Sequence, residues 1–379
     1  MQMSIVLAPD SFKGSLSAAQ VAQAMARGVQ RVLPKTNLTL LPLSDGGEGL
    51  VDSLAAASGG KILDYQVTGP LGEKVTAQMG LMGNGQTAVI EMAQASGLIL
   101  VPEDKRNPLQ TTTFGTGELI KKALDLGCNH LIIGIGGSAT NDGGLGMAQA
   151  LGFRFLDEEG QSLGFGGGEL ARLARIDASS KDPRLEGTTI EVACDVTNPL
   201  TGPSGAAHIY GPQKGATPEM VELLDKGLAN FDRVLQRDLG KSVGQVPGAG
   251  AAGGLGAGLM ALLGGRLVSG IELVLDVLEF DAKAKGAQLI ITGEGKFDAQ
   301  SAFGKVPMGV AQRARSLGVP VVVVAGSVLP SADVLHGEGV TAYFSILNQP
   351  MTLKEAMERG AELVENQAAQ VVRLFTATM

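Results

Sequence analysis

The sequence has few cysteines and histidines, the residues from which disulfides, zinc sites and many catalytic sites are built. Its 379 residues include only 2 cysteines, Cys128 and Cys194, too few for a disulfide framework and typical of a reducing compartment. The 3 histidines, His130, His208 and His336, are scattered, so a zinc site or a Ser-His-Asp hydrolase lacks its ingredients. Chemistry in this chain therefore has to rest on carboxylates, hydroxyls, lysines and glycines.

Basic residues are also scarce. Lys and Arg number 30 against 38 Asp and Glu, the net charge is −8, and no long basic block occurs. This balance argues against nucleic acid or an anionic membrane as the main partner. An anionic small molecule remains a suitable partner, provided that lysine or arginine side chains gather locally at its site.

Membrane and export signals are weak as well. The first ten residues lack a basic segment, and their apolar run is too short for a signal peptide. Residues 242–265 have the length of a membrane span, but their many glycines and alanines are only weakly apolar. We therefore expect this window to form a buried loop and helix in a cytoplasmic protein.

The length exceeds what one hydrophobic core usually supports, so two domains are expected. Residues 1–64 and 284–379 both alternate short apolar strands with helices, which is typical of a parallel α/β sheet. Together they predict one five-stranded domain. Residues 65–283 begin with alternating strands and glycine turns, as in an antiparallel meander, and continue with helices. They predict an inserted, mixed α/β domain.

Five polar, glycine-rich turns follow apolar strands, and ligands of parallel sheets collect at that edge. The turns are APDSFKGS, LSDGGEG, GIGGSATNDGG, ACDVTNPLTG and ITGEGKFDAQS. An ordinary turn or helix cap explains any single one of them, but five together indicate a binding site. Their carboxylates are hard oxygen ligands of the kind that Mg²⁺ prefers. These carboxylates are Asp45, Glu48, Asp195, Glu294 and Asp298.

The first of these turns carries a lysine between two serines. We expect Ser11, Lys13 and Ser15 at a helix N-terminus, where free N–H groups and a lysine can hold a carboxylate or a phosphate. The alternative is that a serine merely caps the helix while Lys13 lies in solvent.

Two other motifs are rejected. GIGGSA, residues 134–139, resembles a dinucleotide fingerprint with Asp157 about 20 residues on, but Asp142 would lie too close to a pyrophosphate. LGKS, residues 239–242, ends like a P-loop, but Leu235 stands where the first glycine belongs. ATP would have to bind through a different loop.

Seven motifs, taken in order along the chain, resemble those of the type I glycerate kinases. They are APDSFKGSLSA, LPLSDGGEG, GIGGSATNDGG, ACDVTNPLTGPSGAA, YGPQKGA, TGEGKFDAQS and GKVP. The resemblance implies a flavodoxin-like domain built from both chain ends and an inserted domain with restriction-endonuclease-like topology. It also implies Mg²⁺, ATP as phosphoryl donor and D-glycerate as acceptor, with 2-phospho-D-glycerate as product. On this resemblance we expect the active site in the cleft between the domains.

Phosphoryl transfer mainly requires the protein to position the reactants and to neutralise charge. We assign residues to these tasks as hypotheses. Asp195 is the preferred base for the attacking hydroxyl, with Asp10 as its rival. Lys13 and Lys214 would neutralise phosphate or hold the glycerate carboxylate, and Ser11 and Asn198 would contact the substrate. Nucleotide phosphates are assigned to Gly136, Gly137, Ser138, Thr140, Asn141 and Lys214, and Mg²⁺ to Asp45, Glu48, Glu294 and Asp298.

Other functions stay open at this stage. A kinase that forms 3-phosphoglycerate, or one that acts on another small hydroxy acid such as hydroxypyruvate or tartronate, is the serious alternative. A dehydrogenase and a non-catalytic metabolite sensor are disfavoured, the first by the Thr-Asn-Asp insertion after GIGGSA and the second by the carboxylates at the strand ends. The sequence does not decide between a monomer and a homo-oligomer.

Overall fold

The computed structural model describes residues 3–302 and 304–377. Contacts divide the chain into two compact units. The first contains residues 1–45, 52–59 and 269–379, and the second contains residues 46–51 and 60–268. The prediction of an α/β protein is confirmed. None of the helices in the described residues is both long and apolar enough to cross a membrane.

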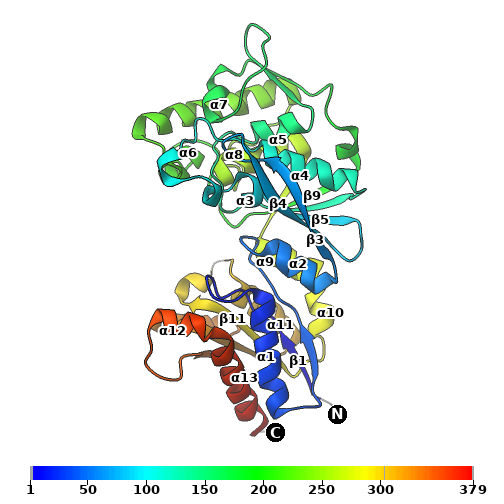
Figure 1. The fold of residues 1–379 in the computed structure, drawn as a ribbon, viewed down its shortest axis with the longest axis vertical. Coiled ribbons are helices and arrows are strands. Elements are labelled where there is room, and N and C mark those ends of the chain that lie inside the picture. The colour runs from blue at the N-terminus through cyan, green and yellow to red at the C-terminus, as the bar shows by residue number, and fades with distance from the viewer. Residues whose placement is uncertain (1–2, 303, 378–379) are drawn as a thin grey trace. The chain divides into compact units, whose positions relative to one another are not determined.

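The first unit is built on a five-stranded, fully parallel sheet (Figure 1). Its strands lie in the order β13-β12-β11-β1-β2. Counted within this unit the order is 2-1-3-4-5, which is common among doubly wound sheets. The chain reverses its direction of travel across the sheet between β1 and β11. The strands are β1 (Ser4–Leu7), β2 (Asn37–Leu40), β11 (Leu289–Phe297), β12 (Val321–Val328) and β13 (Ala342–Ser345).

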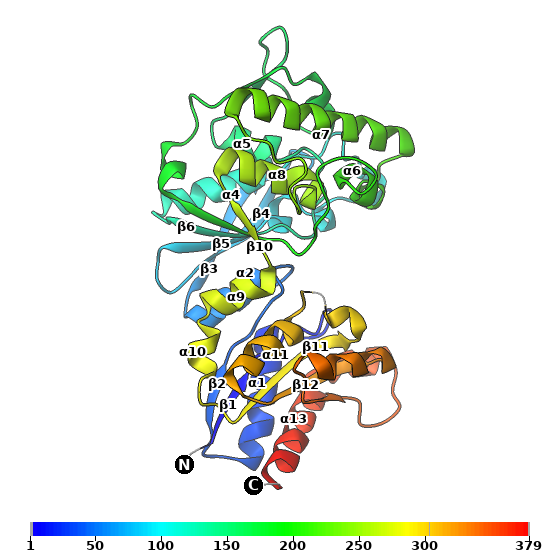
Figure 2. The same ribbon diagram turned by 180° about the vertical axis from the view of Figure 1, so that it is seen from behind.

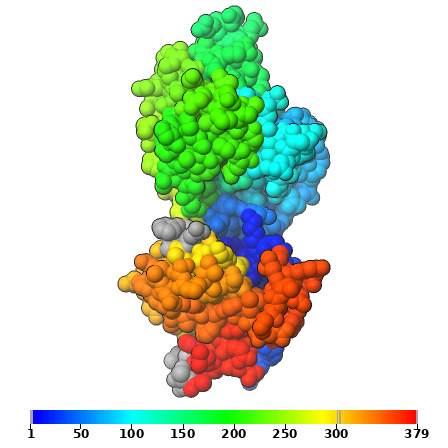
Figure 3. Space-filling view, turned by 90° about the vertical axis from the view of Figure 1, so that its left-hand side faces the viewer, coloured from blue at the N-terminus to red at the C-terminus, as the bar shows by residue number. Residues whose placement is uncertain are grey.

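Helices cover both faces of this sheet, which explains why its strands read as continuous apolar runs. Ile5 and Leu7 pack with α1 (Ala18–Val32) and α13 (Gly360–Ala377), while the alternate residue Val6 is equally buried. Figure 3 shows the surface of the C-terminal helices in orange and red. α1 and α13 approach closely at Gly28, where an added Cβ would lie 2.2 Å from the Glu365 carbonyl oxygen. The other helices are α2 (Leu50–Ser58), α9 (Gly270–Val277), α10 (Phe280–Ala284), α11 (Val306–Leu317) and α12 (Leu353–Glu358).

The second unit is built on a six-stranded mixed sheet in the order β10-β9-β6-β5-β4-β3 (Figure 2). β3 (Lys61–Thr68), β4 (Lys74–Leu81) and β5 (Thr87–Glu91) form the predicted antiparallel meander. β6 (His130–Gly134), β9 (Thr189–Ala193) and β10 (Arg266–Val268) continue from β5 in parallel. The parallel part therefore brings the carboxyl ends of β6 and β9 to the same edge.

The remaining elements of the second unit pack around this sheet. A separate antiparallel hairpin pairs β7 (Arg154–Leu156) with β8 (Arg175–Asp177). The helices are α3 (Ala93–Ser96), α4 (Phe114–Asp125), α5 (Leu145–Ala150), α6 (Ala206–Tyr210), α7 (Pro218–Leu239) and α8 (Ala251–Leu263). The window 242–265 contains α8 and, as predicted, is mostly buried.

The unit boundaries differ from the expected ones at 64–65 and 283–284. β3 already begins at Lys61 and pairs along its whole length with β4, so it belongs to the second unit. At the other boundary, α9 and α10 pack against α11 and so belong to the first unit. The flavodoxin-like and restriction-endonuclease-like names stay predictions.

One helix prediction also needs correction. α1 begins after Ser17, whose side chain accepts from the Gln20 N–H in a complete capping box, so Ser11, Lys13 and Ser15 precede the helix instead of opening it. At the C-terminal end of the described chain, α12 and α13 are separated only by Arg359.

Candidate functional site

The second unit contains a pocket of about 390 Å³ at the carboxyl ends of β6 and β9. This is the edge where ligands of parallel α/β sheets bind. Its volume lies within the range of small-molecule sites. The lining residues are Gly46, Gly47, Leu98, Ile135, Gly136, Gly137, Ser138, Ala193, Cys194, Asp195, Val196, Tyr210, Gln213, Lys214, Ala251 and Ala252.

The turn after β6 contributes Gly136 and Gly137 to the pocket lining. Gly136 and Gly137 are exposed, and Gly137 has a φ of +73°, a conformation that favours glycine. The Gly137 carbonyl accepts from the Leu98 N–H at 2.8 Å, which fixes the turn against the segment after α3. Within the described chain, the N–H groups of Gly136 and Gly137 have no acceptor. Such unpaired N–H groups form a concave site for an anion.

Lys214 supports this turn from inside the protein. Its side chain is 1% exposed, and its Nζ donates to Ser138 Oγ at 2.7 Å and to the Thr140 carbonyl at 2.6 Å. Burial lowers the pKa of Lys214 to about 7, and the nearby Asp142 carboxylate opposes the shift. The sequence predicted Lys214 as a phosphate ligand, which stays a prediction; Lys214 belongs to the pocket lining, and its ammonium group is bonded to the turn after β6.

Asp142 points into the fold. Its carboxylate accepts hydrogen bonds from the Thr113 N–H and hydroxyl and from the N–H groups of Gly144 and Gly146, at 2.8 to 3.2 Å. Burial raises the pKa of Asp142, whereas these hydrogen bonds lower it. The carboxylate that made a dinucleotide fingerprint unattractive therefore shapes the turn into α5.

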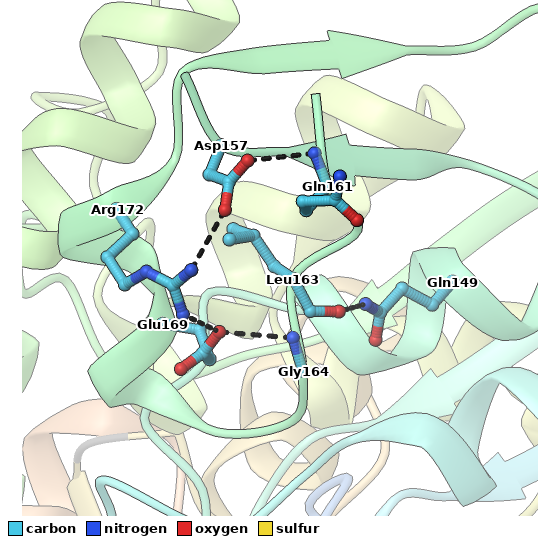
Figure 4. Close-up of polar contacts among 7 residues, drawn as sticks. All are labelled: Gln149, Asp157, Gln161, Leu163, Gly164, Glu169 and Arg172. Atoms are coloured by element: carbon cyan, nitrogen blue, oxygen red, sulfur yellow. Dashed lines mark hydrogen bonds and ion pairs between the residues drawn. The ribbon is translucent and has the colours of Figure 1, made fainter. Parts of the chain in front are cut away.

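Asp157, the other acidic residue of that rejected fingerprint, also has partners within the chain. Its carboxylate accepts from the Gln161 N–H at 2.8 Å and pairs with Arg172 at 2.8 Å (Figure 4). Arg172 also contacts Glu169, which accepts from the Gly164 N–H. These contacts tie the β7 hairpin to the segment before β8 and give Asp157 a structural role.

Thr140 and Asn141, predicted to bind phosphate, are buried and do not line the pocket. In the described part of the chain, Thr140 Oγ1 and both polar atoms of the Asn141 side chain have no hydrogen-bond partner. Their turn packs so closely against α8 that an added Cβ at Gly253 would lie 2.0 Å from the Thr140 carbonyl oxygen. Their direct contact with a nucleotide stays a prediction.

The segment after β9 also contributes to the pocket lining. Asp195 is exposed and lines the pocket, and its role as general base stays a prediction. Asn198 has partners at both polar ends: its Oδ1 accepts from the Tyr210 hydroxyl at 2.6 Å, and its Nδ2 donates to the Ser204 carbonyl at 2.8 Å. The structure thus shows Asn198 holding Tyr210, whereas its predicted substrate contact remains untested.

Several lining residues were not predicted. Tyr210 and Gln213 lie in the YGPQKGA motif beside Lys214, so the motif pointed to them without giving them a role. Leu98 and Ala252 come from apolar or glycine-rich segments that carry no chemical signal in the sequence. Ala252 has a φ of +52° and is one of two described non-glycine residues with positive φ, which marks local backbone strain beside the pocket.

The first unit has several acidic side chains near β1 and β11, the two strands between which the strand order changes direction. Asp10 follows β1, Asp45 follows β2, and Glu294 lies in β11. Burial raises the pKa of Asp10 to about 7, and the Asp45 carboxylate adds to the rise. Burial also raises the pKa of Glu294. The prediction that Glu294 follows its strand was wrong, because β11 continues to Phe297.

Lysines and a serine contact part of this acidic set. Glu294 accepts from the Ser301 hydroxyl at 2.5 Å and pairs with Lys305 at 3.2 Å. Asp298 pairs with Lys296 at 2.9 Å. Glu48, the fourth predicted metal ligand, is exposed and belongs by its contacts to the second unit.

These carboxylates do not form a ready-made metal centre. No group of three or more His, Cys, Asp or Glu side chains suited to a metal ion occurs in residues 3–302 and 304–377. Mg²⁺ commonly uses only one or two carboxylates and completes its shell with water and phosphate oxygens. The oxygen donors of the first unit fit that mode, whereas they do not fit a metal bound by protein alone.

Ser11 and Lys13 lie in the loop between β1 and α1. The Ser11 N–H donates to Asp10 Oδ1 at 2.6 Å, and Lys13 is exposed. An added Cβ at Gly295 would lie 3.5 Å from the Lys13 backbone nitrogen, so this loop runs beside β11. Both residues are therefore near the acidic set, without the helix N-terminus that the sequence predicted.

Known proteins resemble the chain over nearly its whole length. The model of the Glycerate kinase family matches residues 5–376. Glycerate kinase from Halalkalibacterium halodurans is 52% identical over 367 residues, which are 97% of each chain. Glycerate 2-kinase from Escherichia coli (strain K12) is 53% identical over 359 residues, 95% of this chain and 94% of that relative.

A solved structure gives the same result in three dimensions. A crystal structure assigned to glycerate kinase 2 from Salmonella typhimurium LT2 matches this chain with a TM-score of 0.93 and 49% sequence identity. The match covers 100% of this chain and 99% of the other.

Proposed function

Because the chain belongs to the glycerate kinase family, we propose that it transfers the γ-phosphoryl group of ATP to D-glycerate and forms 2-phospho-D-glycerate and ADP. The observation that carries the proposal is the exposed Gly136–Gly137 turn with Lys214 behind it. Unpaired N–H groups backed by a buried cation are suited to bind phosphate oxygens. We assign the nucleotide to this pocket.

The pocket also favours a nucleotide over the smaller substrate. D-Glycerate has three carbon atoms and is polar throughout, so a wall of apolar side chains offers it little. Leu98, Ile135 and Tyr210 contribute such a wall, next to the polar turn. Ligands with an apolar face and an anionic end match this lining.

In the proposed reaction, a glycerate hydroxyl oxygen attacks the γ-phosphorus as the bond to the β–γ bridging oxygen breaks. ADP leaves, and a carboxylate accepts the hydroxyl proton. Asp195 is the first candidate because it lines the same pocket as the phosphate-binding turn. Asp10 is the alternative, since it lies at the carboxyl end of β1 among the acidic residues of the first unit.

Mg²⁺ would be held by Asp45, Glu294 and Asp298, directly or through water, with Glu48 as the further candidate. When bound, the ion neutralises charge on the β- and γ-phosphate oxygens. Lys13 and Ser11 are assigned to the glycerate carboxylate, because they lie in the loop beside these acidic residues.

A coupled ADP-release assay with MgATP tests the proposal. D-Glycerate, L-glycerate, tartronate and hydroxypyruvate are compared as acceptors, and phosphorus NMR locates the phosphate in the product. We expect turnover with D-glycerate and a 2-phosphate. A 3-phosphate product would still support a glycerate kinase, but it would show that the other hydroxyl group reacts. Absence of ADP release with every acceptor would contradict the proposal.

A further inference from the structure

Tyr210 and Gln213 are pocket-lining side chains to which the proposed transfer step gives no role. Both lie on the short segment that leads to Lys214. We propose that Tyr210 stacks on the adenine ring of ATP and that the Gln213 amide hydrogen-bonds to the 6-amino group of the base. This inference rests on the proposed function, which places the nucleotide in this pocket.

The Tyr210 ring is held in place before any ligand binds. Its hydroxyl donates to Asn198 Oδ1 at 2.6 Å, and Asn198 Nδ2 donates to the Ser204 carbonyl at 2.8 Å. The Asn198 carbonyl in turn accepts from the Gly250 N–H at 3.0 Å. A ring fixed in this way loses little conformational entropy on binding. Its aromatic face can therefore serve as a stacking platform for a base.

Gln213 differs from its neighbour Lys214 in direction and in partners. It lies in a short 3₁₀ helix, Pro212–Lys214, in which successive side chains point about 120° apart. Both residues line the pocket, but Lys214 is buried and bonded to Ser138 and Thr140, whereas Gln213 is exposed. Within the described residues, the Gln213 amide has no hydrogen-bond partner. Its donor and acceptor groups are therefore available to a ligand.

An amide is chemically suited to the edge of adenine. The oxygen of glutamine accepts from the 6-amino group while its NH₂ donates to N7, a pairing that recurs where proteins read adenine. Purine riboside triphosphate lacks the 6-amino group and keeps the ring and the phosphates. It therefore separates recognition by Gln213 from stacking on Tyr210.

The test measures kcat/KM for ATP and for purine riboside triphosphate with D-glycerate as acceptor. We expect the wild type to favour ATP by about 10-fold, the value of one good hydrogen bond to a ligand. In Q213A this preference should fall toward unity. In Y210A, KM should rise about 10-fold for both nucleotides. In Y210F, which keeps the ring, the rise in KM should be much smaller. Q236A, an exposed glutamine of α7 outside the pocket, is the matched control.

Two results would overturn the inference while leaving the kinase intact. One is an unchanged preference in Q213A, and the other is an unchanged KM in Y210A, each with normal turnover on D-glycerate. Calorimetric binding of ADP and purine riboside diphosphate to the same variants provides a readout without turnover. Base recognition thus remains testable if the wild type phosphorylates no acceptor, and equal binding of both diphosphates by the wild type and Q213A would contradict it.

Discussion

Lys214 and Ser138 are joined by a 2.7 Å hydrogen bond that lies wholly inside the protein, although the two residues are 76 positions apart. The bond links the segment after α6 to the turn after β6, and a second bond from Lys214 reaches the Thr140 carbonyl. The Lys214 ammonium group therefore serves two purposes: it holds the turn in shape and places a positive charge next to a turn that lines the pocket.

Replacing Lys214 with methionine should separate this residue from an ordinary surface lysine. K214M keeps the length of the side chain but leaves Ser138 Oγ and the Thr140 carbonyl without their donor. We expect KM for ATP to rise by about 10- to 100-fold and the free energy of unfolding to fall by about 1–3 kcal/mol, because buried polar groups lose their partner. S138A, which removes only one of the two bonds, should show a smaller effect in both urea unfolding and steady-state kinetics. A K214M protein with wild-type KM for ATP would refute the assigned role.

The lowered pKa of Lys214 gives ATP binding a pH dependence. With a pKa of about 7 in the folded protein, Lys214 loses its charge as the pH rises through neutrality, long before an ordinary lysine would. Asp142 is the carboxylate that faces it and opposes the shift. Since the protonated form attracts phosphate, kcat/KM for ATP should fall above about pH 7 in the wild type, and K214M should lack this limb of the profile. The same limb in both proteins would assign the titration to another group.

The same shift predicts the pH dependence of stability. Between the folded pKa of about 7 and the ordinary value near 10.5, the unfolded chain binds a proton at Lys214 that the folded protein does not. Stability contributed by this group therefore increases with pH across that window and is lowest below pH 7. Urea unfolding at pH 6.5 and pH 9 should show the wild type gaining stability relative to K214M. A constant difference between the two proteins would mean that the folded pKa of Lys214 is not lowered.

Asp142 should matter for folding more than any other carboxylate of this unit. Four hydrogen bonds from Thr113, Gly144 and Gly146 end on it, and it is fully buried. In D142N, an NH₂ group would face donors that need an acceptor, so we expect a loss of about 2–4 kcal/mol in urea unfolding. D195N, at an exposed position, serves as the control and should unfold like the wild type. Equal stability of D142N and the wild type would contradict the role of Asp142 in shaping the turn.

The sequence predicted the two sheets well because strand and helix periods are local signals. The meander of the second unit and the βα units of the first follow directly from alternation and apolar runs. The start of α1 was placed too early because Ser11, Ser15 and Ser17 are all good N-cap residues. Only Ser17 is followed three positions later by a glutamine that completes a capping box, a signal that was present in the sequence.

The site was harder to predict because side-chain direction depends on tertiary packing. Lys214 and Gln213 are adjacent polar residues of the pocket lining, yet Lys214 is buried and bonded to the turn after β6, whereas Gln213 is exposed. Nothing in the motif itself distinguishes the two directions. Asn198 likewise resembles a ligand in sequence, and its partner Tyr210 is 12 positions away on another element.

The identity of the general base provides the sharpest test of the proposed chemistry. Asp195 is exposed in the pocket, so D195N should fold normally, bind ATP with little change in KM and lower kcat by about 10²- to 10⁴-fold. D10N is the comparison, because Asp10 lies among the acidic residues of the first unit and not in the pocket lining. Rapid-quench measurement of the chemical step separates loss of proton transfer from slow product release. If D195N keeps normal turnover while D10N loses it, the base is Asp10, and the hydroxyl of glycerate is activated by the carboxyl end of β1.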